Sequence, residues 1–374
     1  MRNFVGHIGG KQCIITNRKC FCMRIGIFTQ PLKDNYGGIL QNLALQRVLR
    51  RMGHYPVTID YDIWRPPLLG RIRLGVQNLF RKSKLSGRRF DIERFVCAQI
   101  NMTSRVSTDR QLKHCMKTNH FDVVLTGSDQ VWRRAYNPRL DWSFLSFANK
   151  LPRIAYAASI GIDYWDFTEE ETCRCAELLK NFIAVSVREA SAVELCRKYF
   201  GRNDVKVVLD PTMLLDASDY PSINGAATNR PYVFTYILDW DYCKGRIVES
   251  LTKELGLPEY SSEYNSFGKK REKRLSIEGW LTGISNANLV ICDSFHGTAF
   301  SILNHRPFIV LCNSERGNTR MQWLLELFEL QDRMVQDISE VDSLAPIDWD
   351  SIDTILNRER RKSINFLNTA LKSV

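Results

Sequence analysis

No stretch of the sequence approaches the roughly 20 consecutive apolar residues that a membrane-spanning helix needs. The first 22 residues are basic and interrupted by glycine, and they lack the unbroken apolar core and small-residue cleavage site of a secretory signal. These absences exclude an integral membrane protein and a secreted one, so we expect a cytoplasmic globular protein. The folding pattern begins at Met23, and we expect residues 1–22 to be a leader outside the fold, either non-native or disordered.

Metal-site patterns are also missing, although the chain has 11 cysteines. Cys20 and Cys22, and likewise Cys173 and Cys175, are separated by one residue, whereas zinc sites use paired C-x-x-C spacing or histidine partners. Scattered cysteines of this kind are typical of free thiols in a reducing compartment. The sequence therefore predicts no metal centre, and we expect no resident cofactor.

The positive charge of the chain is concentrated in one segment. The formal net charge is +11, and residues 64–118 carry 13 Lys and Arg against three Asp and Glu, a net charge of +10. Apolar residues from Leu68 to Phe80 recur there at helical spacing beside Arg71 and Arg81, the pattern of a basic amphipathic helix. Two interpretations stay open: a surface helix with a solvated charged face, and a helix that contacts an anionic membrane surface. No nucleic-acid-reading motif accompanies the charge, so we expect no nucleic-acid partner.

Short apolar runs alternate with helix-type periodicity along the first half of the chain. Residues 24–29 and 55–61 have the pattern of strands, and residues 37–54 between them place apolar side chains at helical spacing. Such a βαβ unit implies a parallel sheet, whose strand carboxyl ends are where ligands bind. Further predicted strands, each with polar residues or Gly at its end, lie at 121–127, 153–159, 182–189 and 205–211.

A segment rich in Ser, Asn, Ala, Gly and Pro, residues 216–231, separates this series from a second one. We therefore expect an α/β protein of two Rossmann-like domains that face each other across a cleft, with a C-terminal helix returning to the first domain. The second series has predicted strands at 232–238, 288–294 and 307–311. The expected boundaries are 23–220 for the first domain with its basic insert at 64–118, 221–345 for the second domain, and 346–374 for the returning helix.

Three loops at strand ends carry candidate functional residues. In the first loop, Gly37 and Gly38 would let the backbone approach a ligand at a helix N-terminus, and Asn35 and Gln41 can both donate and accept hydrogen bonds. With Tyr36, these residues form part of a candidate acceptor site. The alternative is that the two glycines only turn a strand into a helix, since the GxGxxG spacing of a dinucleotide site is absent.

The second loop brings Ser128, Asp129, Gln130 and Trp132 together after a predicted strand. Carboxylate and amide groups read sugar hydroxyls, and an aromatic ring covers the apolar face of a pyranose, so these residues complete the candidate acceptor site. An ionised Asp129 beside a hydroxyl could act as a general base. The alternative is an Asp N-cap with Trp132 packed in the core.

The third loop places His296 between a strand-type run and a helix-type run. Such a turn exposes backbone N–H groups and the positive end of the helix dipole, which attract an anion. Asp293 and Ser294 precede the histidine as orienting partners, and Gly297 and Thr298 begin the helix. The alternative is a histidine with a purely structural hydrogen bond, and the residues alone leave both open.

Five motifs occur in a fixed order over most of the chain: DNYGGILQNLALQ, GSDQVW, SVRE, VVLDPTMLL and CDSFHG. This ordered set resembles the polysaccharide pyruvyl transferase family. The resemblance implies a GT-B-like enzyme that moves a pyruvyl group from phosphoenolpyruvate onto two hydroxyls of one sugar, forming a cyclic ketal and releasing phosphate. It also implies that Arg188, in SVRE, and His296, in CDSFHG, serve the donor.

One position departs from the family pattern. Members often carry an arginine two residues before the histidine, and Ser294 occupies that place here. The departure implies a differently held donor, or a compensating guanidinium from the segment SERGNTR, where Arg316 and Arg320 are the candidates.

The expected chemistry follows from the donor. Phosphoenolpyruvate carries a carboxylate and a phosphate close together, so its site needs a bidentate cation and oriented N–H donors. We expect Arg188, Ser294 and the helix start at Gly297 and Thr298 to supply them without a metal. His296 would act as general acid or stabilise the leaving phosphate, with Asp129 or Asp293 as base.

The acceptor stays open among a sugar on a lipid diphosphate, a nucleotide sugar and a finished polymer, in cell-surface, capsule or exopolysaccharide biosynthesis. For a lipid-linked acceptor, the basic segment at 64–118 would hold the enzyme peripherally on the inner face of the membrane. Two rival functions fit the same architecture: a nucleotide-sugar-dependent GT-B glycosyltransferase, and a non-catalytic glycan-pathway binding protein, which the departure at Ser294 would favour.

Overall fold

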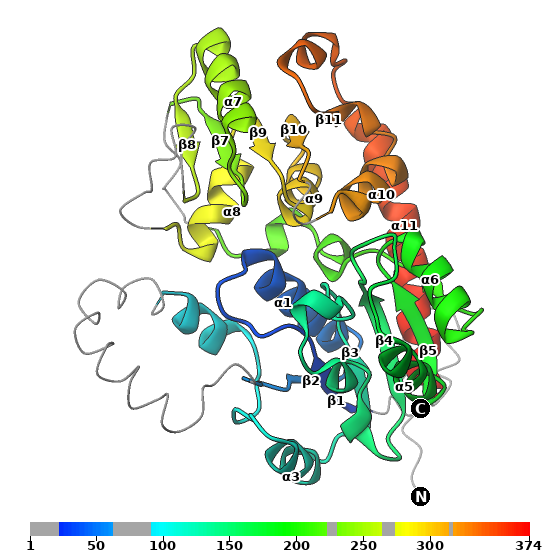
Figure 1. Cartoon of the computed structure of the whole chain (residues 1–374). Helices are drawn as coiled ribbons and strands as arrows, with labels where there is room; N and C mark the ends of the chain where they lie inside the picture. Colours follow the sequence, from blue (N-terminus) through cyan, green and yellow to red (C-terminus); the bar gives the residue numbers. More distant parts are fainter. Residues whose placement is uncertain (1–21, 63–90, 223–229, 264–273, 314–316) are drawn as a thin grey trace, which may run out of the picture.

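The computed structural model describes residues 22–62, 91–222, 230–263, 274–313 and 317–374. It contains two parallel sheets with helices packed around them, which confirms the expected α/β architecture of two Rossmann-like domains (Figure 1). The predicted amphipathic helix around residues 68–80, the leader up to residue 21, and Arg316 lie outside the described residues.

The first sheet has six parallel strands in the order β2-β1-β3-β4-β5-β6. All six fall within the runs predicted from sequence, and the central strands β1, β3 and β4 are buried almost throughout, as their continuous apolar stretches predict. The strands are β1 (Arg24–Phe28), β2 (Tyr55–Thr58), β3 (Val123–Thr126), β4 (Arg153–Ala158), β5 (Phe182–Val187) and β6 (Lys206–Val207). The helices of this domain are α1 (Tyr36–Arg51), α3 (Asp109–Asn119), α4 (Leu140–Ser143), α5 (Glu169–Leu179) and α6 (Ala190–Phe200), together with a helical stretch at 91–99.

The second sheet has five parallel strands in the order β11-β10-β9-β7-β8. Three match predicted runs, whereas β8 and β11 do not lie within a longer apolar run of the sequence. The strands are β7 (Val233–Tyr236), β8 (Glu259–Ser261), β9 (Leu289–Cys292), β10 (Phe308–Leu311) and β11 (Met334–Val335). The helices are α7 (Tyr242–Leu255), α8 (Ile277–Ser285), α9 (Phe295–Leu303) and α10 (Thr319–Leu327). Short 3-10 helices are η1 (Arg134–Tyr136), η2 (Ser146–Ala148), η3 (Pro211–Leu214), η4 (Ala217–Asp219), η5 (Gln331–Arg333) and η6 (Ile338–Ser343).

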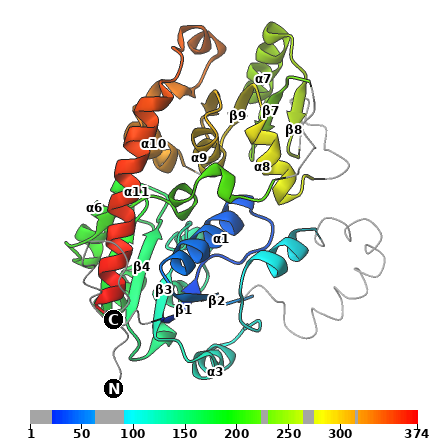
Figure 2. The same cartoon turned by 180° about the vertical axis from the view of Figure 1, so that it is seen from behind.

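Helix α1 lies at the junction of the two domains (Figures 1 and 2). The Tyr36 ring at its start stacks on Trp280 of α8 at 5.4 Å, and the Tyr36 hydroxyl donates to the Leu275 carbonyl at 2.5 Å. Apolar residues of α1 share one hydrophobic cluster with residues of both sheets and of α8 and α9. This shared core fixes the start of α1 relative to the second domain.

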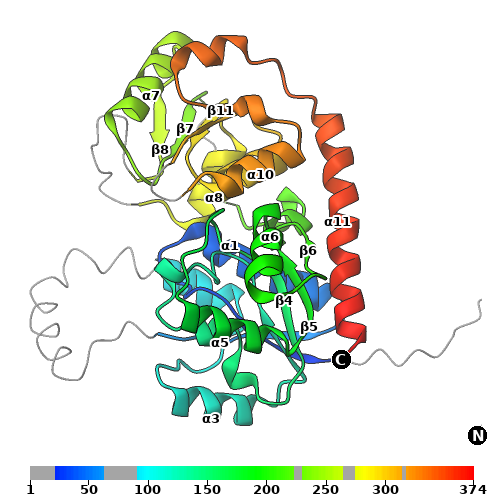
Figure 3. The same cartoon turned by 45° about the vertical axis from the view of Figure 1, so that its right-hand side comes forward.

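Helix α11 (Trp349–Lys372) runs from the second domain back along the first, as expected (Figure 3). Its Ser363 hydroxyl accepts a hydrogen bond from the Leu209 N–H at 2.9 Å, and Arg360 donates to the carbonyls of Met213 and Leu215. The last strand of the first sheet ends at Val207 and the first strand of the second begins at Val233, and the exact domain boundaries stay predictions.

Candidate active site

The candidate site lies where carboxyl ends of strands from both sheets meet. Asp129 follows β3, Arg188 follows β5 and Asp210 follows β6, while His296 lies in the first turn of α9, after β9. All four side chains are buried. Loops at the carboxyl ends of parallel strands form the usual ligand site of open α/β sheets, so this position agrees with the expectation from the sequence.

Asp210 lies at the centre of the site. Its Oδ2 accepts hydrogen bonds from Arg188 Nη1 at 2.7 Å and Ser128 Oγ at 2.8 Å, and lies 3.7 Å from His296 Nε2. Its Oδ1 accepts from the backbone N–H and the hydroxyl of Thr212. Burial raises the pKa of this carboxyl, but the His296 imidazole and the Arg188 guanidinium outweigh burial and hold the pKa well below its ordinary value. Asp210 is therefore an ionised carboxylate that is hydrogen-bonded to Arg188 and within ion-pair distance of His296, whose Nε2 has no hydrogen-bond partner among the described residues.

Two buried guanidinium groups belong to this site, one from each domain. Arg188 stacks over the Phe295 ring at 4.1 Å, and Arg320 lies in the first turn of α10. Burial, reinforced by the nearby charge of Arg188, lowers the pKa of Arg320 to about 10. Within the described residues, Arg188 Nε, Arg188 Nη2 and Arg320 Nε have no hydrogen-bond partner. A buried N–H group without a partner costs about 1–3 kcal/mol, and a bound anion would remove that cost.

The backbone of α1 comes so close to His296 that position 37 has no room for a side chain. A Cβ on Gly37 would lie 1.9 Å from His296 Nδ1, far inside contact distance. A Cβ on Gly38 would lie 3.1 Å from Asn35 Nδ2 and 3.2 Å from Asp129 Oδ2, which is tight without being an overlap. The sequence predicts a close backbone approach here, and the structure shows that the approaching group is the imidazole.

Asp129 joins the first loop to the site. Its Oδ2 accepts from Asn35 Nδ2 at 3.2 Å, and its Oδ1 accepts from the Gln130 N–H at 2.9 Å and lies 3.7 Å from Arg188 Nη2. Its φ of 78° lies in the left-handed region, which costs a non-glycine residue roughly 1–2 kcal/mol. Residues 129–133 form a turn and not a helix start, so the alternative of an Asp N-cap does not apply. Strained backbone of this kind is concentrated at functional sites.

Trp132 packs in the core and does not face the cleft. Its ring is fully buried and stacks on Phe144 at 4.9 Å, and its indole N–H donates to the Ser143 carbonyl at 3.3 Å. The prediction that this ring covers a sugar is therefore wrong, because the core takes up both its face and its N–H group.

Asp293 has a structural role in place of the predicted role as a base. Its carboxylate accepts from the N–H groups of Leu238 and Asp239 at 2.7 and 3.2 Å. It also accepts from Lys244 Nζ and Asn313 Nδ2, both at 2.9 Å. A buried carboxylate with these four donors is not available to take a proton from a sugar hydroxyl.

Part of the start of α9 is also hydrogen-bonded within the chain. Ser294 is its N-cap, with Oγ accepting from the Gly297 N–H at 3.0 Å, and the Thr298 hydroxyl donates to the Ser294 carbonyl at 3.1 Å. The Ser294 side chain and the Gly297 N–H, which were expected to hold the donor, are thus occupied by one another. The anion-binding capacity of the site rests mainly on its two arginines.

The remaining residues of the predicted acceptor site divide into two groups. The Tyr36 hydroxyl and the Gln41 side-chain N–H groups are used internally, the latter by Thr29 Oγ1 and the Gly38 carbonyl at 2.9 Å each. By contrast, Gln130 Nε2 is buried with no partner in the part of the chain that the structure describes. Gln41 Oε1 has no partner there either, so Gln130 Nε2 and Gln41 Oε1 are better placed to receive a ligand group than the Tyr36 hydroxyl.

Sequence analysis missed two acidic residues of the site, Asp210 and Glu189. Glu189 follows Arg188 directly, and its Oε1 accepts from Ser159 Oγ and from the N–H groups of Ile160 and Gly161 at 2.9–3.0 Å. The available signal is their place in the sequence, since each acid stands at the end of a predicted strand. Among the described residues, no group of three or more His, Cys, Asp and Glu side chains is arranged to hold a metal ion.

Several solved structures share the fold. A putative UDP-N-acetylglucosamine 2-epimerase from Listeria monocytogenes is similar with a TM-score of 0.56 and 11% identity, covering 94% of this chain and 96% of that one. UDP-GlcNAc 2-epimerases from Neisseria meningitidis, bound to UDP-GlcNAc, and from Methanocaldococcus jannaschii give TM-scores of 0.54 and 0.51 at 9% and 11% identity. They cover 94% and 90% of this chain and 100% and 92% of their own. At such identity the likeness shows the fold alone, which is the expected GT-B-like arrangement.

The family is shown by the sequence itself. A search of proteins with curated functions found no match. The family pattern described as "Polysaccharide pyruvyl transferase" matches residues 35–315, which is most of the chain. The match includes Arg188, Asp210 and His296, and it ends just before Arg320. The chain therefore belongs to the polysaccharide pyruvyl transferase family.

Proposed function

We propose that this protein transfers a pyruvyl group from phosphoenolpyruvate to two hydroxyls of one sugar, forming a cyclic ketal and releasing phosphate. Membership of the family supports a transferase of polysaccharide biosynthesis. The observation that carries the donor assignment is the pair of buried guanidiniums, Arg188 and Arg320, with N–H groups that have no partner in the described residues. A small ligand with a carboxylate and a phosphate would satisfy both groups and neutralise their mutual repulsion.

Arg320 takes the part of the arginine that the family often carries at the position of Ser294. It lies in the first turn of α10, and the charges of Arg188, Asp129 and Glu189 all act on its pKa. The donor site thus keeps a second arginine, although this arginine stands at a different position in the sequence. This argument also weakens the non-catalytic alternative, whose main support was the serine at position 294.

In the overall reaction, two protons leave the sugar hydroxyls, and the methylene carbon and the phosphate gain one each. The methylene carbon of phosphoenolpyruvate gains one, which makes C2 electrophilic, and the sugar hydroxyls that attack C2 lose two as the C2–O bond to phosphate breaks. One of the two protons lost by the hydroxyls restores the acid that protonated the methylene carbon. The other leaves on the phosphate. His296 is the general acid in this scheme, with the Asp210 carboxylate 3.7 Å from its Nε2, and Asp129 is the base that faces the acceptor. Arg188 and Arg320 stabilise the departing phosphate.

The acceptor is a sugar that binds beside Asn35, Asp129 and Gln130, at the first-domain side of the site. A sugar carried on a lipid diphosphate is one form, and contact of the basic segment 64–118 with the inner face of the membrane would then assist binding. No helix in the described part of the chain is long and apolar enough to cross a bilayer. Membrane contact in this proposal is peripheral.

The test is donor binding and turnover in matched arginine variants. Arg320→Met keeps most of the side-chain volume but removes the charge, and we expect phosphoenolpyruvate to bind about 10- to 100-fold more weakly in calorimetric titration. Arg246→Met is the control, because this arginine is 66% exposed on α7. Phosphate release with sugar acceptors, followed by detection of the ketal by NMR, checks the reaction. Equal affinity of Arg320→Met and wild type would contradict the donor site.

A nucleotide-sugar glycosyltransferase is the second candidate, because the GT-B-like fold also suits that function. UDP and GDP titrations in the same experiment distinguish the two. Binding of a nucleoside diphosphate without binding of phosphoenolpyruvate would favour the glycosyltransferase, and the reverse result would exclude it.

A further inference from the structure

Four hydrogen-bond donors converge on the carboxylate of Asp293 in the second domain. Two are backbone N–H groups of Leu238 and Asp239, which follow β7. The third is Lys244 Nζ from the first turn of α7, and the fourth is Asn313 Nδ2, which follows β10. The Asp293, Lys244 and Asn313 residues are 1%, 7% and 1% exposed. Paired backbone N–H groups with an ammonium and an amide form the kind of donor set that binds phosphate in proteins.

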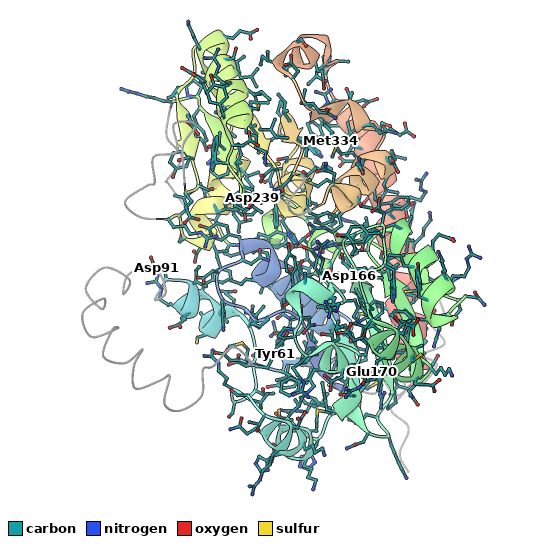
Figure 4. All side chains as sticks on the ribbon, viewed as in Figure 1. Tyr61, Asp91, Asp166, Glu170, Asp239 and Met334 are labelled. Carbon is teal, nitrogen blue, oxygen red and sulfur yellow. The ribbon has the colours of Figure 1, made fainter. Side chains whose placement is uncertain are left out.

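This cluster stands at the topological switch point of the second sheet. β7 and β9 are neighbours, but the strand order continues to β8 on one side and to β10 and β11 on the other. Connections on the two sides diverge there, and open α/β sheets bind their ligands in the crevice that results. Asp293 follows β9 directly and Asp239 follows β7, and Figure 4 places Asp239 at the side of the second domain that faces the first.

We infer that this cluster of donors is an anion-binding site that the chain fills with its own Asp293 carboxylate, and that Asp293 thereby excludes nucleoside diphosphates from the second domain. A phosphate at this point would have to displace a carboxylate that is held by four donors, and would meet its negative charge. The site selects against nucleotide-linked donors and leaves anion recognition to the two arginines in the cleft. The inference does not require that phosphoenolpyruvate is the donor.

Removal of the internal carboxylate tests the inference. Asp293→Ala leaves Lys244 buried without its counter-charge, and we expect the Tm to fall by about 10 °C. Sulfate, added at constant ionic strength against chloride, should restore part of this loss in a saturable way. Since the cleft arginines give the wild type a sulfate response of its own, the quantity that counts is the excess shift of the variant over the wild type.

The control is the double variant Asp293→Ala/Lys244→Met, which lacks both charges and should show no excess sulfate response. If Asp293→Ala does not fold, Asp293→Ser answers the same question, since it leaves a smaller polar group and room for an anion. UDP should not raise the Tm of the wild type more than it raises the Tm of Lys244→Met. An Asp293 variant with no excess response to sulfate, or UDP binding to the wild type that is lost in Lys244→Met, would overturn the inference.

Discussion

The close approach of α1 to His296 gives the sharpest prediction. In Gly37→Ala the new Cβ would lie 1.9 Å from His296 Nδ1, so either the imidazole or the start of α1 must shift. If His296 is the general acid, its displacement should lower kcat about 10²- to 10⁴-fold. The change adds one methyl group to a packed site, which costs about 1–3 kcal/mol, and alanine in a helix recovers up to about 1 kcal/mol. The net loss of stability is therefore about 0–3 kcal/mol, and the folded state should survive.

The assay compares phosphate release and thermal unfolding in Gly37→Ala and Gly38→Ala. The second variant gains the same helix propensity, but its Cβ meets Asn35 and Asp129 at 3.1 Å or more. We expect Gly38→Ala to lose less activity at a similar Tm. In the double variant Gly37→Ala/His296→Ala, the effects on kcat should not add, because both act through one side chain. Wild-type kcat in Gly37→Ala, or full additivity in the double variant, would refute the reasoning.

Three further predictions concern stability. The pKa of Asp210 is depressed in the folded state, so its contribution to stability is present above the ordinary pKa and is lost as pH falls below about 4. Asp210→Asn should therefore show a smaller fall in Tm between about pH 5 and pH 2 than the wild type, and equal falls would contradict this. Trp132→Phe should lower the free energy of unfolding by about 1–3 kcal/mol in urea titrations, and the KM for the acceptor should not change. A raised KM without a loss of stability would show that this ring contacts the acceptor. Arg360→Ala loses its hydrogen bonds to Met213, Leu215 and Asp216, which should lower the free energy of unfolding by about 1–4 kcal/mol. Limited proteolysis should then cleave α11 faster in Arg360→Ala than in the wild type, and the control Arg358→Ala should show neither effect.

The fold could be predicted from the sequence where burial is two-sided. The apolar runs of the first sheet mark its strands, and their spacing marks the helices between them. β8 and β11 could not be predicted in this way, since neither lies within a longer apolar run, whereas the similarly short β6 does. Their pairing with β7 and β10 is decided by the sheet that is already present.

The candidate site was predictable in its location but not in its partners. Loop positions after β3 and β5 place Asp129 and Arg188 at one edge of the first sheet, and His296 follows β9 at the corresponding edge of the second sheet, so the two domains together form the site. The sequence cannot show that Asp293 would bind Lys244 or that Trp132 would stack on Phe144, because these contacts join segments far apart in the chain. Asp210 shows the same limit: only the three-dimensional structure places it between Arg188 and His296.

The route of α11 has a consequence for synthesis on the ribosome. The first domain buries its Leu209 to Leu215 region against Ser363 and Arg360, and the Tyr156 ring lies 6.3 Å from that of Phe366. These α11 residues emerge after roughly 150 further residues have been translated, which takes about 10–30 s at ordinary elongation rates. During this interval the surface that α11 will cover is exposed to solvent and to other nascent chains. The domain that is made first therefore gains this helix only after the second domain has been synthesised.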